Sequence, residues 1–525
     1  MRPRFGFRRG RWPWLVGAVV AALAVLAGVI IGGSTSNQAE SSRASGGTPT
    51  GQTPMSSGEG PLRSRPNVVF VLTDDLSLDL LRYMPHVQAM ERDGLTFSNY
   101  FVSDSLCCPS RASIFTGDFP HDTKVFGNTG RQGGFHVFHD RGEENRTFAV
   151  ALQRAGYRTA LMGKYLNGYL DGQGPPPDVP PTYVPPGWST WEVAGDGYPE
   201  YDYVLNSDGA VRVYGNQPSD YLTDVIARKG IEFIDQSAAA RRPFFLELST
   251  FAPHSPFVPA PRDASAFPGL RAPRPPSFDV LPTHAPRWLK GHPPLSFRQI
   301  AHIDRIYRRR AQSVRAVDLM IGQIEADLRS KGIAENTYIV FSSDNGLHTG
   351  QYRLAPGKLT AFDTDIHVPL VVVGPGVPAG ARTEQMTENI DLAPTFAALG
   401  GTAVRADGRS LLPLLRRDSV RDWRNAILVE HKGPRLGRND PDFQQSASGD
   451  PTSYEAIRTR RYLYVEYRDG EREYYDLVRD PFELHNLAGT LPPRTVSSLH
   501  RDLTSLKRCH HERACSAADH VPRAP

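Results

Sequence analysis

The segment from residue 107 to residue 117, CCPSRASIFTG, holds the most specific chemical pattern in the chain. Cys107 stands two positions before a proline, and a Ser-Arg pair and a Thr-Gly pair follow it. Pro109 suits the first turn of a helix, where its missing N–H leaves no bond unmade. We therefore expect Cys107 at a helix N-terminus, where free N–H groups and the helix dipole favour an anionic substrate.

A disulfide, a zinc site or a redox pair would explain Cys107-Cys108 less well than a reactive residue at position 107. A disulfide between adjacent cysteines requires a strained ring. A zinc site would need further Cys or His residues at ligand spacing, and none lies nearby in the sequence. A thiol-redox role is disfavoured because the C-x-x-C spacing is missing. A buried core position remains the expected role of Cys108 alone.

Two apolar runs end in carboxylates. Residues 67–72 (NVVFVL) precede Thr-Asp-Asp, and residues 338–341 (YIVF) precede Ser-Ser-Asp-Asn-Gly. Such runs are typical of buried parallel strands. Asp, Asn and Gly also end strands in solvated turns, but paired oxygen ligands suit a hard divalent cation. The candidate metal ligands are Asp74, Asp75, Asp344 and Asn345.

Together these motifs resemble the type I sulfatases. In that family the first cysteine of C-x-P-S-R is oxidised to Cα-formylglycine by a formylglycine-generating enzyme. The resemblance implies that Cys107 is modified in this way. One hydroxyl of the hydrated aldehyde would attack the sulfur of a sulfate ester, and the second would then expel the sulfate. It also implies that the four candidate ligands bind Ca²⁺ together with residue 107, and that the ion polarises the sulfate.

Three further phrases resemble the cationic contacts of the family: MGKYLN, APHSP and GKLTAFDTDIHVPL, which begin at residues 162, 252 and 357. Fixed cations around a sulfate stabilise the charge that develops on its oxygens. Either His254 or Lys358 would protonate the leaving alcohol, and the sequence does not decide between them. The residues that the resemblance places around the sulfate or residue 107 are Arg111, Lys164, His254 and Lys358.

One position departs from many arylsulfatases, which have a histidine two residues after the GK lysine. Leu166 takes that place here, and Asn167 follows it. The phrase GKYLNGY instead resembles the branch of N-acetylglucosamine-6-sulfatases and heparan endosulfatases. Residues 184–191, 220–235 and 343–354 agree with that branch.

This branch implies a sulfated sugar as substrate, with glucosamine 6-sulfate the specific expectation. Asn167 and His348 are the candidate substrate-binding residues. His348 could also replace the missing histidine in proton transfer, or could simply be a water-exposed loop residue. Trp188 and Trp191 are candidates for the aromatic faces at the pocket mouth, with ordinary packing as the alternative.

The N-terminal region predicts export. Residues 1–33 combine a basic start with an uncharged apolar run, which is typical of an export signal or a membrane anchor, with the uncleaved anchor slightly favoured. Residues 34–64 are rich in Ser, Gly, Thr and Pro and predict a flexible tether. The expected location is the cell surface or the exterior, with membrane contact through the N-terminal segment.

Composition gives no sign of a nucleic-acid partner. The formal net charge is +4, and five arginines lie before Trp12, so the remainder carries 4 − 5 = −1. A near-neutral body without an aromatic–basic motif does not have the electrostatic footprint of a nucleic-acid-binding protein.

Strand and helix patterns alternate over residues 65–424, the expected catalytic domain. This alternation predicts an α/β sandwich around a mostly parallel sheet, and the resemblance implies the alkaline-phosphatase-like version. Ligand sites in such sheets lie beyond the carboxyl ends of the strands.

Residues 425–525 predict a C-terminal subdomain with an antiparallel sheet and a helix. Period-two patterns recur there, and Asp469-Gly470 is a strong hairpin signal. Cys509 and Cys515 are expected to form a disulfide outside the cytoplasm. A metal site is the lesser alternative, because two histidines lie between them.

Two other functions remain to be weighed. A phosphatase or phosphonate monoester hydrolase of the same superfamily would share the metal-site architecture. A non-catalytic, carbohydrate-binding relative would be expected to lack a metal ligand or the modifiable cysteine, and this sequence has both.

Overall fold

The structure is a computed structural model that describes residues 65–130, 133–170, 179–418, 420, 422–433, 440–444 and 446–522. The predicted signal or anchor and the predicted tether, residues 1–33 and 34–64, lie outside the described residues. Among the residues it does describe, no helix has both the length and the apolar character needed to cross a bilayer.

Ten strands form one large sheet with the order β10-β2-β9-β8-β1-β7-β3-β4-β5-β6. The five strands from β8 to β4 in this order are parallel to their neighbours, and antiparallel pairs join them to β9 on one side and β5 on the other. The strands are β1 (Asn67–Thr73), β2 (Leu95–Phe101), β3 (Arg158–Lys164), β4 (Thr190–Ala194), β5 (Val204–Ser207), β6 (Ala210–Val213), β7 (Phe244–Ser249), β8 (Thr337–Ser343), β9 (Leu370–Val373) and β10 (Ala381–Glu388).

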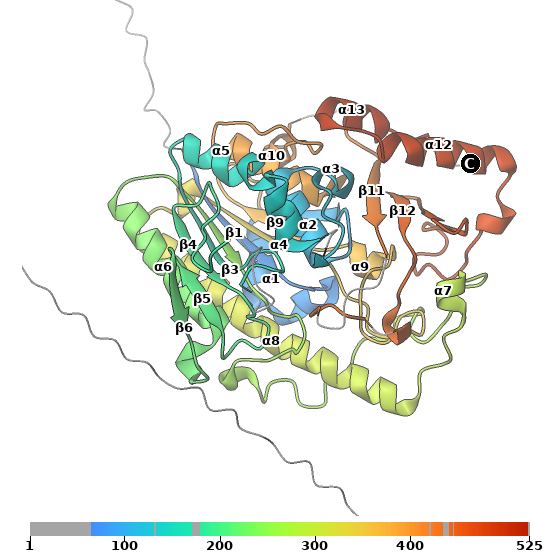
Figure 1. Cartoon of the computed structure of the whole chain (residues 1–525), viewed down its shortest axis with the longest axis horizontal. Helices are drawn as coiled ribbons and strands as arrows, with labels where there is room; N and C mark the ends of the chain where they lie inside the picture. Colours follow the sequence, from blue (N-terminus) through green and yellow to red (C-terminus); the bar gives the residue numbers. More distant parts are fainter. Residues whose placement is uncertain are drawn as a thin grey trace, which may run out of the picture. The chain divides into compact units, whose positions relative to one another are not determined.

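Strand β1 shows how the sheet separates two hydrophobic cores. Val68, Phe70 and Leu72 belong to one cluster, whereas Val69 and Val71 belong to another, because successive strand side chains point to opposite faces. Helices α2, α4, α5 and α10 contribute to the first cluster, and α1, α6 and α8 to the second (Figure 1). The helices on these two faces are α1 (Pro85–Asp93), α2 (Cys107–Thr116), α4 (Gly134–Asp140), α5 (Phe148–Arg154), α6 (Leu222–Ala239), α8 (Phe297–Ser330) and α10 (Leu392–Leu399).

A second sheet of four antiparallel strands follows in the C-terminal part of the chain. Gly470 has φ 90° in the turn between its last two strands, a conformation that glycine adopts without a steric penalty. Cys509 and Cys515 are joined by a disulfide. The elements are β11 (Ala426–His431), β12 (Tyr454–Thr459), β13 (Tyr462–Tyr467), β14 (Arg472–Asp476), α12 (Pro493–Leu506) and α13 (His511–Ala518), and the short helices elsewhere are α3 (Pro120–Thr123), α7 (Arg287–Lys290), α9 (Asp363–Ile366) and α11 (Leu412–Leu415).

The predicted fold class is confirmed by these two sheets. The catalytic part has the mixed, mostly parallel sheet with helices on both faces, and the C-terminal part has the antiparallel sheet and helix. The boundary proposed at residues 424 and 425 stays a prediction.

His121, on α3, connects three parts of the fold. Its Nδ1 lies 2.8 Å from Glu430 Oε2 on β11, and its Nε2 lies 2.8 Å from the carbonyl oxygen of Cys509. Burial alone would lower the pKa of His121, but the hydrogen bond and the charge of Glu430 outweigh it and raise the pKa to about 9. The charged imidazolium therefore donates to both partners and holds α3, β11 and the disulfide loop together.

Replacement of His121 by Gln should destabilise the protein in a pH-dependent way. A pKa raised above the ordinary 6.5 contributes stability that is complete below pH 6.5 and is lost as the pH rises through 9, up to about 3 kcal/mol in free energy. The difference in Tm between wild type and variant should thus be largest at pH 6 and smallest at pH 10. The exposed pair of His500 and Glu466 supplies a control, His500→Gln. A Tm difference for His121→Gln that stays constant with pH would contradict the assignment.

Candidate active site

The carboxyl ends of four adjacent parallel strands bring the predicted residues together. Thr73 of β1 pairs with Ser343 of β8, so the carboxylates that follow the two strands lie side by side. On the other side of β1, β7 ends at Ser249 in register with Gly163 of β3. His254 follows β7, and Lys164 is the last residue of β3.

The backbone geometry requires a glycine at position 163, directly before Lys164. The φ of this glycine is +103°, and a Cβ at this position would lie 2.0 Å from the carbonyl oxygen of Ser249. Only a residue without a side chain lets the two strands approach so closely. The close approach fixes Lys164 at the edge of the site.

Cys107, the predicted nucleophile, lies at the start of α2, as the proline pattern predicts. Cys107 is the first residue of the helix, and every residue from Cys107 to Thr116 is buried. Cys108 points away to the core, where its sulfur accepts a hydrogen bond from the backbone N–H of Asn167 at 3.0 Å. The two cysteines therefore have different surroundings, one polar and one structural.

Charged groups surround the sulfur of Cys107. Lys358 Nζ lies 2.9 Å from Sγ, Asp74 Oδ1 lies at 3.2 Å and Asp442 Oδ2 at 3.3 Å. Burial raises the pKa of the Cys107 thiol well above its ordinary value, and Asp442 and Asp74 raise it further. A thiol held in its neutral form is a poor nucleophile and a poor redox group, so the site disfavours the thiol-redox alternative.

Three cations pair with the carboxylates of this cluster. His254 Nε2 lies 2.6 Å from Asp442 Oδ1, and Lys358 Nζ lies 2.6 Å from the same oxygen. Lys164 forms an ion pair with Asp74. Burial would lower the pKa of His254, but Asp75, Asp74 and Asp442 outweigh it and raise the pKa to about 9. These carboxylates favour the protonated imidazole, the form in which a histidine serves as a general acid.

Arg111 connects α2 to the strand ends. Its Nε donates to Asp344 Oδ2 at 2.8 Å and its Nη1 to Ser249 Oγ at 2.6 Å. The third nitrogen, Nη2, has no hydrogen-bond partner among the described residues, so it is available to a group that enters the site. Burial would raise the pKa of Asp344, but Arg111, Lys164 and Lys358 together hold it below its usual range.

The predicted metal ligands fit a hard cation. Asp74, Asp75 and Asp344 are each no more than 2 % exposed, and burial and Asp344 raise the pKa of Asp74. The side-chain oxygen of Asn345 is buried with no hydrogen-bond partner in the described part of the chain. An unpartnered amide oxygen beside three carboxylates is the donor set that Ca²⁺ prefers.

Sequence reasoning missed two polar residues at this site. Asp442 comes from the described segment 440–444, and Asn128 from the loop after α3. Asn128 donates to Asp442 Oδ2 at 2.5 Å and accepts from the backbone N–H of Cys108 at 3.1 Å. Burial would raise the pKa of Asp442, but Lys358 and His254 hold it well below its usual range, so the carboxylate is charged. No motif around residue 442 signals this role.

A cavity of about 320 Å³ opens beside the charged cluster. Lys164, Asn167 and Tyr198 line it, together with Ser255 and Pro441. The Tyr198 ring lies under the Lys164 ammonium at 4.9 Å, and its hydroxyl accepts a hydrogen bond from Asn167 Nδ2 at 2.8 Å. Tyr198 is a third residue of this region that no sequence motif indicates.

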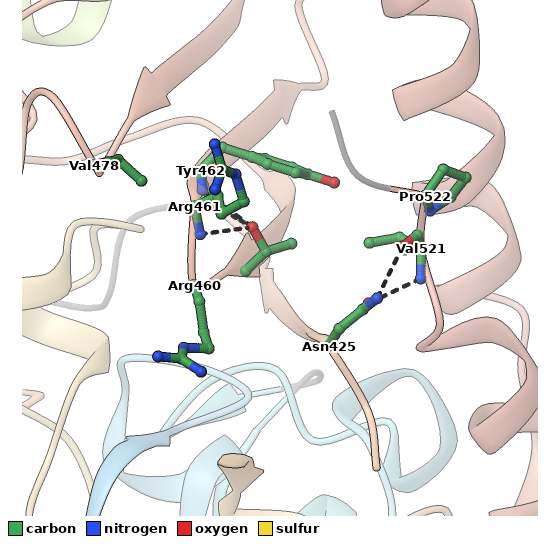
Figure 2. A pocket seen from close by; sticks show the side chains of 8 residues that line it. Asn425, Arg460, Arg461, Tyr462, Val478, Val521 and Pro522 are labelled. Carbon is green, nitrogen blue, oxygen red and sulfur yellow. Dashed lines mark hydrogen bonds between the residues drawn. The ribbon is translucent and has the colours of Figure 1, made fainter. Parts of the chain in front are cut away.

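A second cavity, of about 460 Å³, lies at one end of the small sheet (Figure 2). None of the predicted catalytic residues lines it. Arg460 and Arg461 at its rim point in different directions in Figure 2, and they do not converge on a common point. We therefore place the reaction at the first cavity.

Three substrate-binding candidates are not brought to the cavity. His348 is fully buried. Its Nδ1 lies 3.0 Å from both carboxylate oxygens of Asp365, and its Nε2 lies 3.0 Å from the carbonyl oxygen of Ser448. The placement of Trp188 and Trp191 at the pocket mouth is wrong: they are 7 % and 0 % exposed and belong to an aromatic part of the core.

Comparison with known proteins agrees with this geometry. The family model described as Sulfatase matches residues 66–402, and the model described as N-sulphoglucosamine sulphohydrolase, C-terminal, matches residues 357–508. The chain is 35% identical to human N-acetylglucosamine-6-sulfatase over 474 residues, 85% of each chain. It is also 35% identical to a putative extracellular sulfatase Sulf-1 homolog of Caenorhabditis elegans over 391 residues, which are 71% of this chain and 54% of the relative.

A solved structure described as a complex with D-glucosamine-2-N,6-O-disulfate has the same fold, with a TM-score of 0.67 and 23% identity over 85% of this chain and 98% of the other. The family match covers more than half of the chain and includes every residue placed around Cys107 by the sequence. The chain therefore belongs to the sulfatase family and is a sulfuric ester hydrolase.

Proposed function

We propose that the protein removes the 6-O-sulfate from a glucosamine-containing sugar, with formylglycine at position 107 and a bound Ca²⁺. The observation that carries this proposal is the buried charged cluster beside Cys107, in which Lys164, His254 and Lys358 pair with carboxylates and Asp74 contacts the Cys107 sulfur. The relative named N-acetylglucosamine-6-sulfatase supports the substrate. The full set of proposed functional residues is Asp74, Asp75, Cys107, Arg111, Lys164, Asn167, His254, Asp344, Asn345 and Lys358.

Each side chain has a role that follows from its position. Lys164, His254 and Lys358 bind the sulfate oxygens, and Arg111 orients residue 107 with its unpartnered Nη2. His254 directly precedes Ser255, which lines the cavity, so we assign His254 rather than Lys358 as the donor to the leaving alcohol. Asn167 and Tyr198 contact the sugar. His348 holds the chain before Lys358, since its backbone pairs with Gly357.

Two groups that the family uses complete the chemistry. Formylglycine, once hydrated, supplies one hydroxyl for attack on sulfur and a second to expel the sulfate. Asp74, Asp75, Asp344 and Asn345 would hold the Ca²⁺, which would polarise the sulfate and neutralise its oxygens. Modification of residue 107 would require a formylglycine-generating enzyme as a partner during maturation.

We also propose that the protein acts outside the cytoplasm, anchored or secreted. The basic and apolar N-terminal sequence supports export. The Cys509–Cys515 disulfide is typical of an oxidising compartment.

Replacement of Cys107 by Ala should abolish turnover, by roughly three orders of magnitude or more, because the nucleophile is lost. Cys108→Ala is the matched control: it removes a buried sulfur bonded to Asn167 and should lower Tm while turnover persists. Peptide mass analysis should find sulfur lost and oxygen gained at residue 107 only. Activity in the Cys107→Ala variant would contradict the proposed mechanism.

Asp344→Asn should remove both the metal and the activity. The change deletes one buried charge from the ligand set and from the ion pair with Arg111. Asp318→Asn is the control, since Asp318 is also buried but binds backbone N–H groups at the start of α1. Elemental analysis of the isolated proteins should find one Ca²⁺ in wild type and in the control. Stoichiometric zinc without calcium would contradict the ligand assignment.

The substrate assignment is tested by kcat/KM for glucosamine 6-sulfate, galactose 6-sulfate and a 2-O-sulfated uronate. We expect the glucosamine ester to be preferred, by about tenfold or more, because polar groups built for one sugar are left unpaired by another. Tyr198→Phe should lower the ratio of kcat/KM for the glucosamine ester over kcat/KM for the other two esters, since it removes the hydroxyl bonded to Asn167. A much higher kcat/KM for the uronate would refute the assignment of a glucosamine ester as substrate, but not the hydrolysis of sulfate esters.

A further inference from the structure

Asp442 lies within the charged cluster but belongs to neither the predicted metal set nor the predicted sulfate contacts. It is 5 % exposed, and its Oδ1 lies 2.6 Å from both His254 Nε2 and Lys358 Nζ. These are two of the cations proposed to bind sulfate. The carboxylate therefore occupies a position where an incoming anion would be bound.

The position of Asp442 is fixed by its own hydrogen bonds. Its Oδ2 accepts from Asn128 Nδ2 at 2.5 Å, and its backbone N–H donates to Asp440 Oδ1 at 2.9 Å. Asn128 also bonds Asp440 and the first turn of α2. When an anion enters, these bonds keep the charge of Asp442 close to it.

We propose that Asp442 makes the site select singly charged sulfate esters against doubly charged phosphate esters, an inference that rests on the proposed function. An anion that binds here must share His254 and Lys358 with a carboxylate, and the Coulomb repulsion grows in proportion to the charge of that anion. A phosphate monoester carries nearly two charges at pH 8, because its second pKa is about 6. A sulfate monoester carries one. Selectivity of this kind arises because repulsion makes the binding free energy of the phosphate ester less favourable.

The test compares 4-nitrophenyl sulfate with 4-nitrophenyl phosphate at pH 8, using enzyme whose formylglycine content is measured. Asp442→Asn keeps the size of the side chain and removes the charge. We expect the ratio of kcat/KM for phosphate over sulfate to rise about tenfold or more. The Ki of inorganic phosphate and the Ki of inorganic sulfate should both fall, and by similar factors, because both free ions carry about two charges at pH 8. Asp442→Glu should keep the ratio near that of the wild type.

Asp440→Asn is the matched control. Asp440 lies two residues before Asp442 and is also buried, but it accepts hydrogen bonds from Asn128, Thr129 and a backbone N–H rather than from a cation. Asparagine retains the Oδ1 acceptor of the turn, so the ratio should not change. If Asp442→Asn does not fold, as judged by its Tm, Asp442→Ser provides a second neutral side chain.

The outcomes separate the two proposals. Wild-type enzyme that contains formylglycine yet does not hydrolyse the sulfate ester would overturn the proposed function. Wild-type enzyme that does hydrolyse it, with a ratio unchanged or lowered in the neutral Asp442 variants, would overturn this inference alone. Equal losses on both esters would assign Asp442 a positioning role without charge selection, and would overturn it as well.

Discussion

The neutralisation of buried charge is the constraint on which the rest of this structure depends. Transfer of one carboxylate or ammonium group from water into a protein interior costs several kcal/mol unless an opposite charge compensates it. Here several groups share the compensation. Lys358, for example, contacts Asp75, Asp442 and the sulfur of Cys107 at the same time. The eight groups that must be brought together are Asp74, Asp75, Asp344, Asp442, Arg111, Lys164, His254 and Lys358.

The parallel sheet meets this constraint because its strands end together. β1 and β8 are paired along their whole length, so the acidic residues that follow them lie side by side at the same edge of the sheet. Hydrophobic clusters on both faces hold the strands in that register, and a slip of one residue would turn each buried side chain to the wrong face. The same packing that stabilises the domain therefore sets the distances within the site.

The parts of the site that the sequence predicted are those linked to a local pattern. Asp74 and Asp344 follow apolar runs, Cys107 precedes a helix-starting proline, and Lys164 follows a glycine that the strand contact requires. Asp442 carries no such pattern: it meets Cys107 across a separation of 335 residues. Its role depends on tertiary contacts that no short segment encodes.

The same reason explains the errors over aromatic and histidine residues. Trp191 was expected at a pocket mouth because sugars bind aromatic faces, but its indole N–H bonds Tyr169 within the core. His348 lies close in sequence to Asp344, yet its backbone turns back to pair with Gly357. Proximity along the chain places a residue near a site, whereas packing decides which way its side chain faces.

The complete burial of α2 has a consequence for the order of events in the life of this protein. Cys107 and the residues after it are inaccessible in the folded domain, and a modifying enzyme must reach several of them to act on the cysteine. Under the proposed function, oxidation of residue 107 would therefore act on the extended chain and precede folding of the core. In a molecule that folds first, the Cys107 thiol is buried, and only unfolding would expose it to a modifying enzyme again.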